Sequence, residues 1–484
     1  MSESKDTQPH KINIAVENFG PIEKAEIDLR PLTIFVGESN TGKTYLAALI
    51  YALQRAFEGI PRLPWLYYNT SQFNPIYHSQ PADLSNQIVL QETQETQKKL
   101  ADTGQPFKFS DLPKWVQDRL KCGSAHSEML ESELKRHFGY ESISEMVRFT
   151  KDRDEVMKIS FEVQEENQTL WSLCFYDSGT EINIDKYIYK DIVFGTEDRD
   201  IFQRALNVKD KGIPLRFLMQ KSATSYYLPA ARSGLMETRG IITSSLIDLA
   251  THGGSEHFTK DSTFSGMIAD FLKFINNYEE REIYPSEIVE VSKTLENKVL
   301  QGEIEASQPA EVGDIQFRYR PLKSEKSLRI SQTSSMISEL TPLVLLLRSV
   351  VFYGDTLIIE EPESHLHPRA QTQIAITLAR LVRAGVRVII TTHSDWLLQQ
   401  IGNLIREGEL KKHDTETSEL PHWLLKEEVG AWWFHTDKPV EEIPFDRIEG
   451  IEPRDYEDVA DNLYNSFVDF ERQFLNEKAE SEDG

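Results

Sequence analysis

The sequence predicts an α/β fold in which a parallel β-sheet is covered by helices on both faces. Continuous apolar runs, typical of strands buried on both sides, occur at residues 32–36, 356–359 and 386–390. Helical stretches follow the first two runs, at residues 45–57 and 372–384. Buried strands that alternate with helices in this way indicate a parallel sheet.

The remaining elements are predicted from local periodicity. Residues 11–16 and 25–29 alternate polar and apolar side chains around a turn at residues 18–21, and residues 157–164 and 169–176 do so as a hairpin. Helices are predicted at residues 127–150, 196–220, 241–251, 263–280 and 289–300. Short strands at residues 315–319 and 328–330 precede a long apolar helix at residues 334–351. We therefore divide the chain into a first part of an α/β head at 1–58, a mainly helical insertion at 59–311, a second part of the head at 312–450 and an acidic tail at 451–484.

Composition narrows the classes of function. The 484-residue chain carries a net charge of −25, so its average surface repels nucleic acid, and any such contact must be local or belong to a partner. Two cysteines make a disulfide framework unexpected. The polar N-terminus has no apolar core of a secretory signal, and no stretch is long enough to cross a bilayer. We therefore expect a cytoplasmic protein without a membrane partner.

The loop after the first buried strand matches a phosphate-binding motif. Residues 37–44 read GESNTGKT, which fits G-x-x-x-x-G-K-[ST] between a strand and a helix. Its glycines let backbone N–H groups surround phosphates, the lysine adds a positive charge, and the last hydroxyl ligates Mg²⁺. ATP and Mg²⁺ are therefore the predicted cofactors. The expected contacts are Gly37, Asn40, Gly42, Lys43 and Thr44, with Thr44 also a metal ligand.

Polar residues also follow the other two buried runs. Glu360 and Glu361 end the second run, where a metal ligand and a base are expected in an α/β site. By position, Glu360 holds Mg²⁺, often through water, and Glu361 polarises the attacking water. His393 ends the third run, within reach of a γ-phosphate or that water. We therefore expect Glu361 and His393 to be catalytic.

Three further segments leave alternatives open. Ser334 and Ser335 begin the long apolar helix, as phosphate ligands or as plain helix caps. The loop at residues 227–234 (YLPAARSG) is either a structural turn or a site whose arginine reaches phosphate or another subunit. The basic window at residues 316–329 is either a solvated hairpin face or a contact for nucleic acid or a partner. His365 and His367 form no convincing metal site, and we expect a structural role for them.

In combination, these motifs resemble the P-loop ABC-type ATPase heads of the SMC/RecF/OLD group. The match runs through NFGPIEKAEIDLRPLTIFVGESNTGKT, YLPAARSG, SSMISELTPL, IIEEPESHLHP and TTHS. The resemblance implies a mixed sheet, and two heads that sandwich ATP with Ser334 and Ser335 contacting the γ-phosphate across the interface. It also implies that Glu361 is the hydrolytic base and His393 a switch histidine.

The chain is also similar to the ATPase subunits of bacterial anti-phage systems such as Septu and PARIS. That similarity implies a multimeric ATPase that holds a separate nuclease effector in check, because no acidic nuclease domain of the OLD kind is expected in the residues after 394. The alternative is a RecF-like DNA-repair ATPase that acts on DNA directly. Only the basic window at residues 316–329 supports it.

Overall fold

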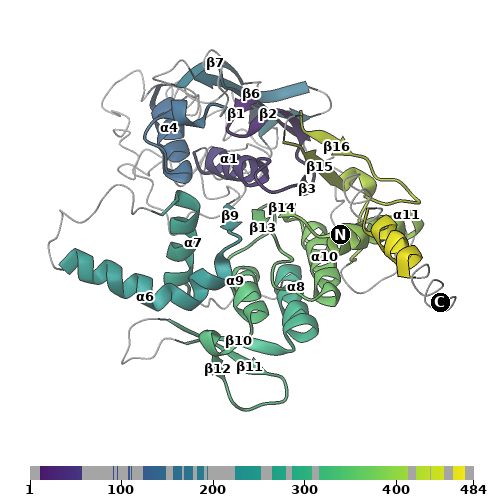
Figure 1. The fold of residues 1–484 in the computed structure, drawn as a ribbon. Helices are drawn as coiled ribbons and strands as arrows, with labels where there is room; N and C mark the ends of the chain where they lie inside the picture. The colour runs from purple at the N-terminus through teal and green to yellow at the C-terminus, as the bar shows by residue number, and fades with distance from the viewer. Residues whose placement is uncertain are drawn as a thin grey trace.

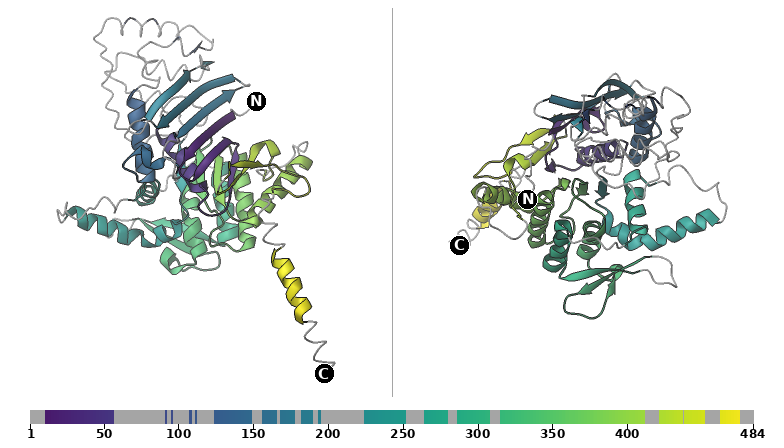
Figure 2. Two further views of the ribbon diagram at one scale, coloured as in Figure 1. Left: turned by 45° about the horizontal axis from the view of Figure 1, so that its top comes forward. Right: turned by 180° about the vertical axis from the view of Figure 1, so that it is seen from behind.

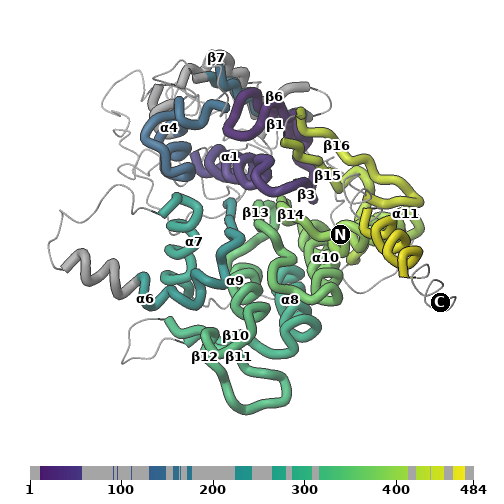
Figure 3. Tube along the Cα trace, viewed as in Figure 1, coloured from purple at the N-terminus to yellow at the C-terminus, as the bar shows by residue number. Residues whose placement is uncertain are grey.

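Two β-sheets with a helix between them organise the molecule (Figure 1). The computed structural model describes residues 11–56, 91, 95, 107–108, 111, 124–148, 156–165, 168–177, 182–189, 193–194, 224–251, 264–279, 286–307, 315–411, 421–436, 438–451 and 462–474. Figure 3 shows how α1 (Lys43–Ala56), from the start of the chain, lies over strands from its last third.

The central sheet has six strands in the order β16-β15-β3-β14-β13-β9. Five of them are parallel, and only β16 runs antiparallel, at one edge. Their bounds are β3 (Leu32–Gly37), β9 (Ser225–Leu228), β13 (Thr356–Glu360), β14 (Arg387–Thr392), β15 (Val429–Phe434) and β16 (Glu441–Ile443). The predicted α/β fold with a mixed sheet and helices on both faces is confirmed.

The apolar runs form strands because both faces of this sheet are covered. In β13, Leu357 and Ile359 point into one hydrophobic core, whereas Ile358 points into a second core on the other face. This alternation follows from the two-residue period of a strand. All residues of β3, β13 and β15 are buried, so a continuous apolar run is what these positions require.

The second sheet is antiparallel, in the order β2-β1-β5-β6-β7 (Figure 2). Its strands are β1 (Lys11–Phe19), β2 (Ile22–Asp28), β5 (Lys158–Glu165), β6 (Gln168–Asp177) and β7 (Ile182–Tyr189). The predicted hairpin is confirmed, since β5 and β6 pair antiparallel. β5 also pairs with β1, so the middle segment of the chain is built onto its N-terminal part.

Helices cover the central sheet on both faces (Figure 1). α1 lies between the two sheets, and α4 packs on α1. Helices on the opposite face contribute to the other core. The bounds are α4 (Ser124–Phe138), α6 (Arg232–Thr251), α7 (Gly266–Asn276), α8 (Glu287–Leu295), α9 (Ser335–Ser349), α10 (Pro368–Arg383) and α11 (Asp395–Lys411). A π-helical turn at Glu296–Leu300 extends α8.

Smaller elements complete the described residues. β10 (Gly302–Ser307), β11 (Gln316–Pro321) and β12 (Leu328–Arg329) form a three-stranded sheet next to α9, and β4 (Phe107–Lys108) pairs with β8 (Val193–Phe194). Residues 462–474 form a helix that projects from the body (Figure 2, left). Within the part of the chain that the structure describes, no helix is long and apolar enough to span a membrane.

Several predicted boundaries differ from the observed ones. α6 begins at Arg232, nine residues before its predicted start, and β9 includes the first two residues of the loop predicted at 227–234. The helix predicted at residues 196–220 lies outside the described residues. The domain boundaries at 58, 311 and 450, and the mainly helical character of the insertion, stay predictions. β9 nevertheless shows that the middle segment contributes a strand to the central sheet.

Candidate active site

The carboxyl ends of four neighbouring strands meet at one edge of the central sheet. β3, β14, β13 and β9 are parallel, so the loops that follow them leave the sheet on the same side. These loops begin after Gly37, Thr392, Glu360 and Leu228. The structure therefore brings the three predicted loops together and adds the loop after β9 as a fourth.

The loop between β3 and α1 closes around the side chain of Lys43. The Lys43 ammonium donates to the carbonyl oxygens of Gly37 at 2.7 Å and Glu38 at 2.5 Å, and only 5% of the residue is exposed. Gly37, Asn40 and Gly42 have φ angles of 138°, 65° and 104°. Such turns in backbone direction are typical of the concave nests of N–H groups that bind phosphate.

The glycines of this loop are required by close packing as well as by φ. A Cβ at Gly42 would lie 2.5 Å from Cγ1 of Ile22, the first residue of β2. A Cβ at Gly37 would lie 2.3 Å from the carbonyl oxygen of Phe434, at the end of β15. The loop is therefore pressed between neighbouring elements, which fixes its shape.

Lys43, Glu361 and His393 lie within electrostatic reach of one another. Burial lowers the pKa of Lys43 to about 8, although the negative charges of Glu361, Glu363 and Glu38 oppose that shift. Burial also lowers the pKa of His393, as does the positive charge of Lys43, whereas Glu361 opposes the change. Lys43 is thus brought into one cluster at the sheet edge with two residues more than 300 positions later in the sequence.

Glu361 has a strained backbone. Its φ of 41° lies in the left-handed region, which costs a non-glycine residue about 1–3 kcal/mol. Its backbone N–H donates to the carbonyl oxygen of Thr391 at 2.9 Å, and its carboxylate accepts from the Ser364 hydroxyl at 3.0 Å. Strain of this kind persists where the surroundings over-determine it, as at active sites.

Glu360 lies beside Glu361 but faces β9. One carboxylate oxygen accepts from the Tyr227 hydroxyl, and the other accepts from the backbone N–H of Ala230 at 2.9 Å. Burial raises the pKa of Glu360, and both hydrogen bonds counteract this. Each carboxylate oxygen keeps a second acceptor position, so water held by a metal ion can still bond to it. These donors fit Mg²⁺ held through water, with the exposed Thr44 hydroxyl as a direct ligand.

Comparison with known families decides the class of this protein. Residues 11–398 match the AAA ATPase domain family, a span that includes most of the first predicted part of the head and residues 312–398 of the second. The chain belongs to the AAA ATPase domain family. It is an ATPase, and ATP is its nucleotide. A search of curated proteins finds no significant match to it.

Solved structures that match the ATPase share little sequence with it. One is an SMC head bound to the C-terminal winged-helix domain of ScpA, with TM-score 0.40, 9% identity and coverage of 91% of this chain and 99% of the other. The SMC head domain from Thermotoga maritima matches with TM-score 0.33 and 10% identity, and the match covers 90% of this chain and 99% of the other. The recombination mediator RecF with a bound nucleotide matches with TM-score 0.34 and 10% identity, and the match covers 90% of this chain and 99% of the other.

Sequence reasoning missed the position of Glu363 in the ATPase. Its carboxylate oxygen Oε1 accepts from the Thr392 hydroxyl and from the backbone N–H of His393, both at 2.7 Å. Burial raises the pKa of Glu363, and these two hydrogen bonds counteract the rise. Glu363 therefore ties the loop after β13 to the loop after β14. Its spacing in the acidic motif is the only sequence signal for this role.

The arginine of the YLPAARSG loop is buried in the ATPase. Arg232 is 1% exposed, and it contacts backbone carbonyl oxygens of Glu360 and Glu361 as well as the carboxylate of Glu339 in α9. The possibility that this side chain reaches phosphate or another subunit is therefore wrong, because its donors are already used inside the fold. The alternative, a structural turn, is correct, and the turn lies directly beneath the site.

Ser334 and Ser335 lie at the N-terminus of α9. Both are exposed, and Ser334 occupies the N-cap position without a side-chain capping bond. Among the described residues, no hydrogen bond or ion pair joins either serine to the phosphate loop. The Ser334 hydroxyl therefore does not cap α9 through a hydrogen bond.

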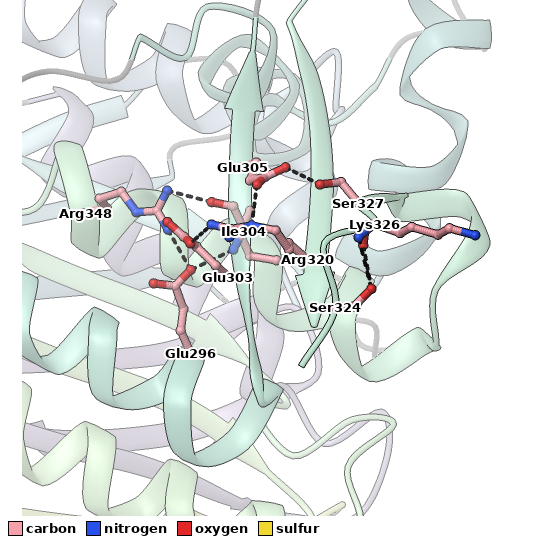
Figure 4. A network of polar contacts seen from close by, with 9 residues as sticks. All are labelled: Glu296, Glu303, Ile304, Glu305, Arg320, Ser324, Lys326, Ser327 and Arg348. Atoms are coloured by element: carbon pink, nitrogen blue, oxygen red, sulfur yellow. Dashed lines mark hydrogen bonds and ion pairs between the residues drawn. The ribbon is translucent and has the colours of Figure 1, made fainter. Parts of the chain in front are cut away.

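The two remaining sequence candidates have defined surroundings. His367 caps α10, since its Nδ1 accepts from the backbone N–H of Arg369 at 3.3 Å. Within the described chain, no group of three or more His, Cys, Asp or Glu residues is placed to hold a metal ion. In the basic window, Arg320 pairs with Glu303 and Glu305 (Figure 4). No ion pair within the described residues involves the window's other basic side chains, namely Arg318, Lys323, Lys326 and Arg329.

Proposed function

We propose that this ATPase forms multimers and is the regulatory subunit of a cytoplasmic bacterial anti-phage defence complex, in which it controls a separate nuclease effector. The catalytic part of the proposal rests on one observation: Lys43, Glu361 and His393 share one electrostatic environment at the ends of parallel strands. The defence part is supported by the motif resemblance and is an analogy.

In this proposal each residue at the sheet edge has a distinct task. Gly37, Asn40 and Gly42 shape the loop that holds the triphosphate, and the Lys43 charge stabilises it. The Thr44 hydroxyl and, through water, Glu360 would hold Mg²⁺, which would neutralise charge that develops on the phosphates. Glu361 accepts the proton of the attacking water, and His393 contacts the γ-phosphate or that water.

The exposed start of α9 supports an intermolecular site. Ser334 and Ser335 present two hydroxyls and the free N–H groups of a helix N-terminus to solvent, a combination that binds phosphate. We propose that they contact the γ-phosphate bound by a second copy. ATP then links two copies, and hydrolysis separates them.

The helix at residues 462–474 supports a protein partner. Five large apolar side chains on it are 59–69% exposed, namely Leu463, Tyr464, Phe467, Phe470 and Phe474. At 100° per residue, four of them fall on one narrow face with Tyr464 beside it. The surrounding sequence, 452–484, is acidic. We propose that the nuclease effector binds this face, and that the effector does so with an apolar groove whose rim is basic.

ATP hydrolysis by purified variants tests the catalytic assignment. Glu361→Gln should bind ATP normally but lose about 10²-fold or more in kcat, because a general base contributes about 10²–10⁴-fold. Lys43→Ala should instead weaken nucleotide binding. Normal turnover by Glu361→Gln would show that the base is assigned wrongly.

Two further measurements test the assembly. Light scattering of the Glu361→Gln variant with ATP should show multimers. Adding Ser334→Ala and Ser335→Ala to this variant should reduce the fraction of multimers but leave the ATP affinity of the monomer unchanged. Phage plaque assays should show protection only when the ATPase is expressed with a neighbouring nuclease gene. Protection by the ATPase alone would contradict the regulatory role.

A RecF-like role on DNA is the second candidate. The basic side chains of β11, β12 and the loop between them favour it, because several of these side chains have no ion-pair partner in the described structure. Such a role predicts ATPase activity that DNA stimulates, with steep salt dependence. Lys323→Glu with Lys326→Glu should abolish that stimulation, and the absence of DNA binding at low salt would exclude this candidate.

A further inference from the structure

One buried guanidinium joins three segments around the base of the candidate site. Arg232 Nη1 donates to the carbonyl oxygens of Pro229 at 3.0 Å and Glu360 at 2.6 Å. Its Nη2 donates to the carbonyl oxygen of Glu361 at 3.0 Å and lies 2.5 Å from Oε1 of Glu339. Its Nε donates to the Glu339 carbonyl oxygen at 3.3 Å. The loop after β9, the end of β13 and helix α9 therefore share one side chain.

Such a group is kept only where it is fully paired. Arg232 is among the largest fully buried side chains of the ATPase, and an uncompensated buried charge strongly disfavours the folded state. Glu339, which is 0% exposed, supplies the opposite charge. The planar fork of arginine reaches several acceptors at once, whereas the single ammonium of lysine cannot hold the same set.

The Glu361 peptide is held from both sides. Its N–H donates to the carbonyl oxygen of Thr391 in β14, and its carbonyl oxygen accepts from Arg232. These two bonds bracket the left-handed φ of 41°. Loss of either bond lets the backbone relax toward a common conformation, which would turn the Glu361 carboxylate away from its present direction.

We propose that Arg232 is a positioning residue for Glu361, and that with Glu339 it connects the Glu361 backbone to the helix that presents Ser334 and Ser335. The inference rests on the proposed function of Glu361 and deepens it. All three nitrogens of the Arg232 guanidinium donate to groups within the fold. It acts on hydrolysis only through the direction of Glu361, and Glu339 lies one helical turn from the start of α9.

The same helix carries a matched control at its other end. Arg348 Nη2 pairs with Glu296 at 2.6 Å, and its Nη1 donates to the carbonyl oxygen of Ile304 at 2.7 Å (Figure 4). This pair is also largely buried and also anchors α9, and the contacts given above join α9 to the π-helical turn after α8 and to β10. A variant there reports the general effect of weakening a buried Arg–Glu pair on α9.

The experiment compares Arg232→Lys with Arg348→Lys in the full chain. We expect Arg232→Lys to lose about 10²-fold in kcat with nucleotide Kd changed less than threefold, because small misplacement of a catalytic group has effects of that size. Arg348→Lys should keep kcat within threefold of the wild-type value, even if its Tm falls as far as that of Arg232→Lys. Equal effects of the two variants on kcat would overturn the inference.

A double-variant cycle separates this inference from the proposed function. In single-turnover assays, Arg232→Lys should cause no further loss in the Glu361→Gln background, because both changes disable the same step. Additive losses would show that Arg232 acts elsewhere. If Glu361→Gln alone keeps normal turnover, the proposed base fails instead.

A neutral variant covers the case in which Arg232→Lys does not fold. Arg232→Gln with Glu339→Gln removes both buried charges, so neither partner is left as an uncompensated buried charge. Glutamine is too short to reach the carbonyl oxygens of both Glu360 and Glu361. We expect the same loss in kcat at near-native Tm, and a wild-type kcat in this variant would overturn the inference.

Discussion

The Glu363 carboxylate accepts a hydrogen bond from the backbone N–H of His393 at 2.7 Å. The same oxygen accepts from Thr392, so two donors depend on it. Glu363→Ala removes this acceptor from both, and an unsatisfied buried donor, here the Thr392 hydroxyl, costs about 1–3 kcal/mol. We therefore expect the free energy of unfolding to fall by about 1–3 kcal/mol in urea titrations.

The exposed Glu325 supplies the control for this prediction, since Glu325→Ala should change the free energy of unfolding by less than about 0.5 kcal/mol. Glu363→Gln keeps an acceptor oxygen and should lie between the two. A Glu363→Ala protein as stable as Glu325→Ala would mean that water replaces the lost acceptor.

Nucleotide affinity should depend on pH through Lys43. Burial lowers its pKa to about 8, so the free protein loses this charge as pH rises through 8. Bound phosphates favour the charged form and raise the pKa again, so affinity is complete below pH 8 and falls above it. Between pH 7 and pH 9 we expect about a tenfold loss in ATP affinity, measured by calorimetry.

Two controls isolate this effect. Arginine stays charged over the whole interval, so Lys43→Arg should lose the pH dependence whatever its absolute affinity. His393 has a pKa below its ordinary value and is neutral throughout, so His393→Ala should keep the dependence. A slope unchanged in Lys43→Arg would assign the titration to another group.

Gly42 should tolerate no side chain. Its φ of 104° is unfavourable for L-residues, and a Cβ would lie 2.5 Å from Ile22 Cγ1. We expect Gly42→Ala to lower Tm and to weaken ATP binding at least tenfold, measured by thermal melts and calorimetry. Gly234, in α6, has nothing within 4 Å of an added Cβ, so Gly234→Ala should leave both quantities nearly unchanged.

The apolar face of helix 462–474 should be needed for partner binding but not for ATP hydrolysis. Phe467→Ser with Phe470→Ser should reduce co-purification of the nuclease effector at least tenfold and leave kcat within threefold. Asn465→Ser with Arg472→Ser alters the opposite face and should leave both unchanged. If both double variants lost co-purification of the effector equally, this face would not be the docking site.

The sequence predicted the elements whose pattern is local. β13, β14 and α9 appear as long apolar runs, and the hairpin of β5 and β6 appears as two alternating segments around a short turn. The P-loop was found because its residue types follow directly from phosphate chemistry. The gathering of Lys43, Glu361 and His393 at one sheet edge could be inferred because the carboxyl ends of parallel strands coincide.

Other features depend on contacts that the sequence does not reveal. β9 is a four-residue edge strand that forms only because β13, from a distant part of the chain, supplies its hydrogen bonds. The burial of Arg232 follows from the meeting of α9, β9 and β13, and no local pattern marks an arginine as internal. Glu363 was visible as an acid, but its acceptor role depends on the neighbouring loop after β14.

The neighbours of β3 bear on how the ATPase folds during synthesis. β3 pairs with β14 on one side and β15 on the other, and both leave the ribosome at least about 350 residues after it. At about 5–20 residues per second, this apolar strand waits roughly 20–70 s for its first partner. During so long a delay, a chaperone or early packing of α1 must shield the apolar β3. Brief translational pauses before residue 387 should therefore increase aggregation of the nascent chain.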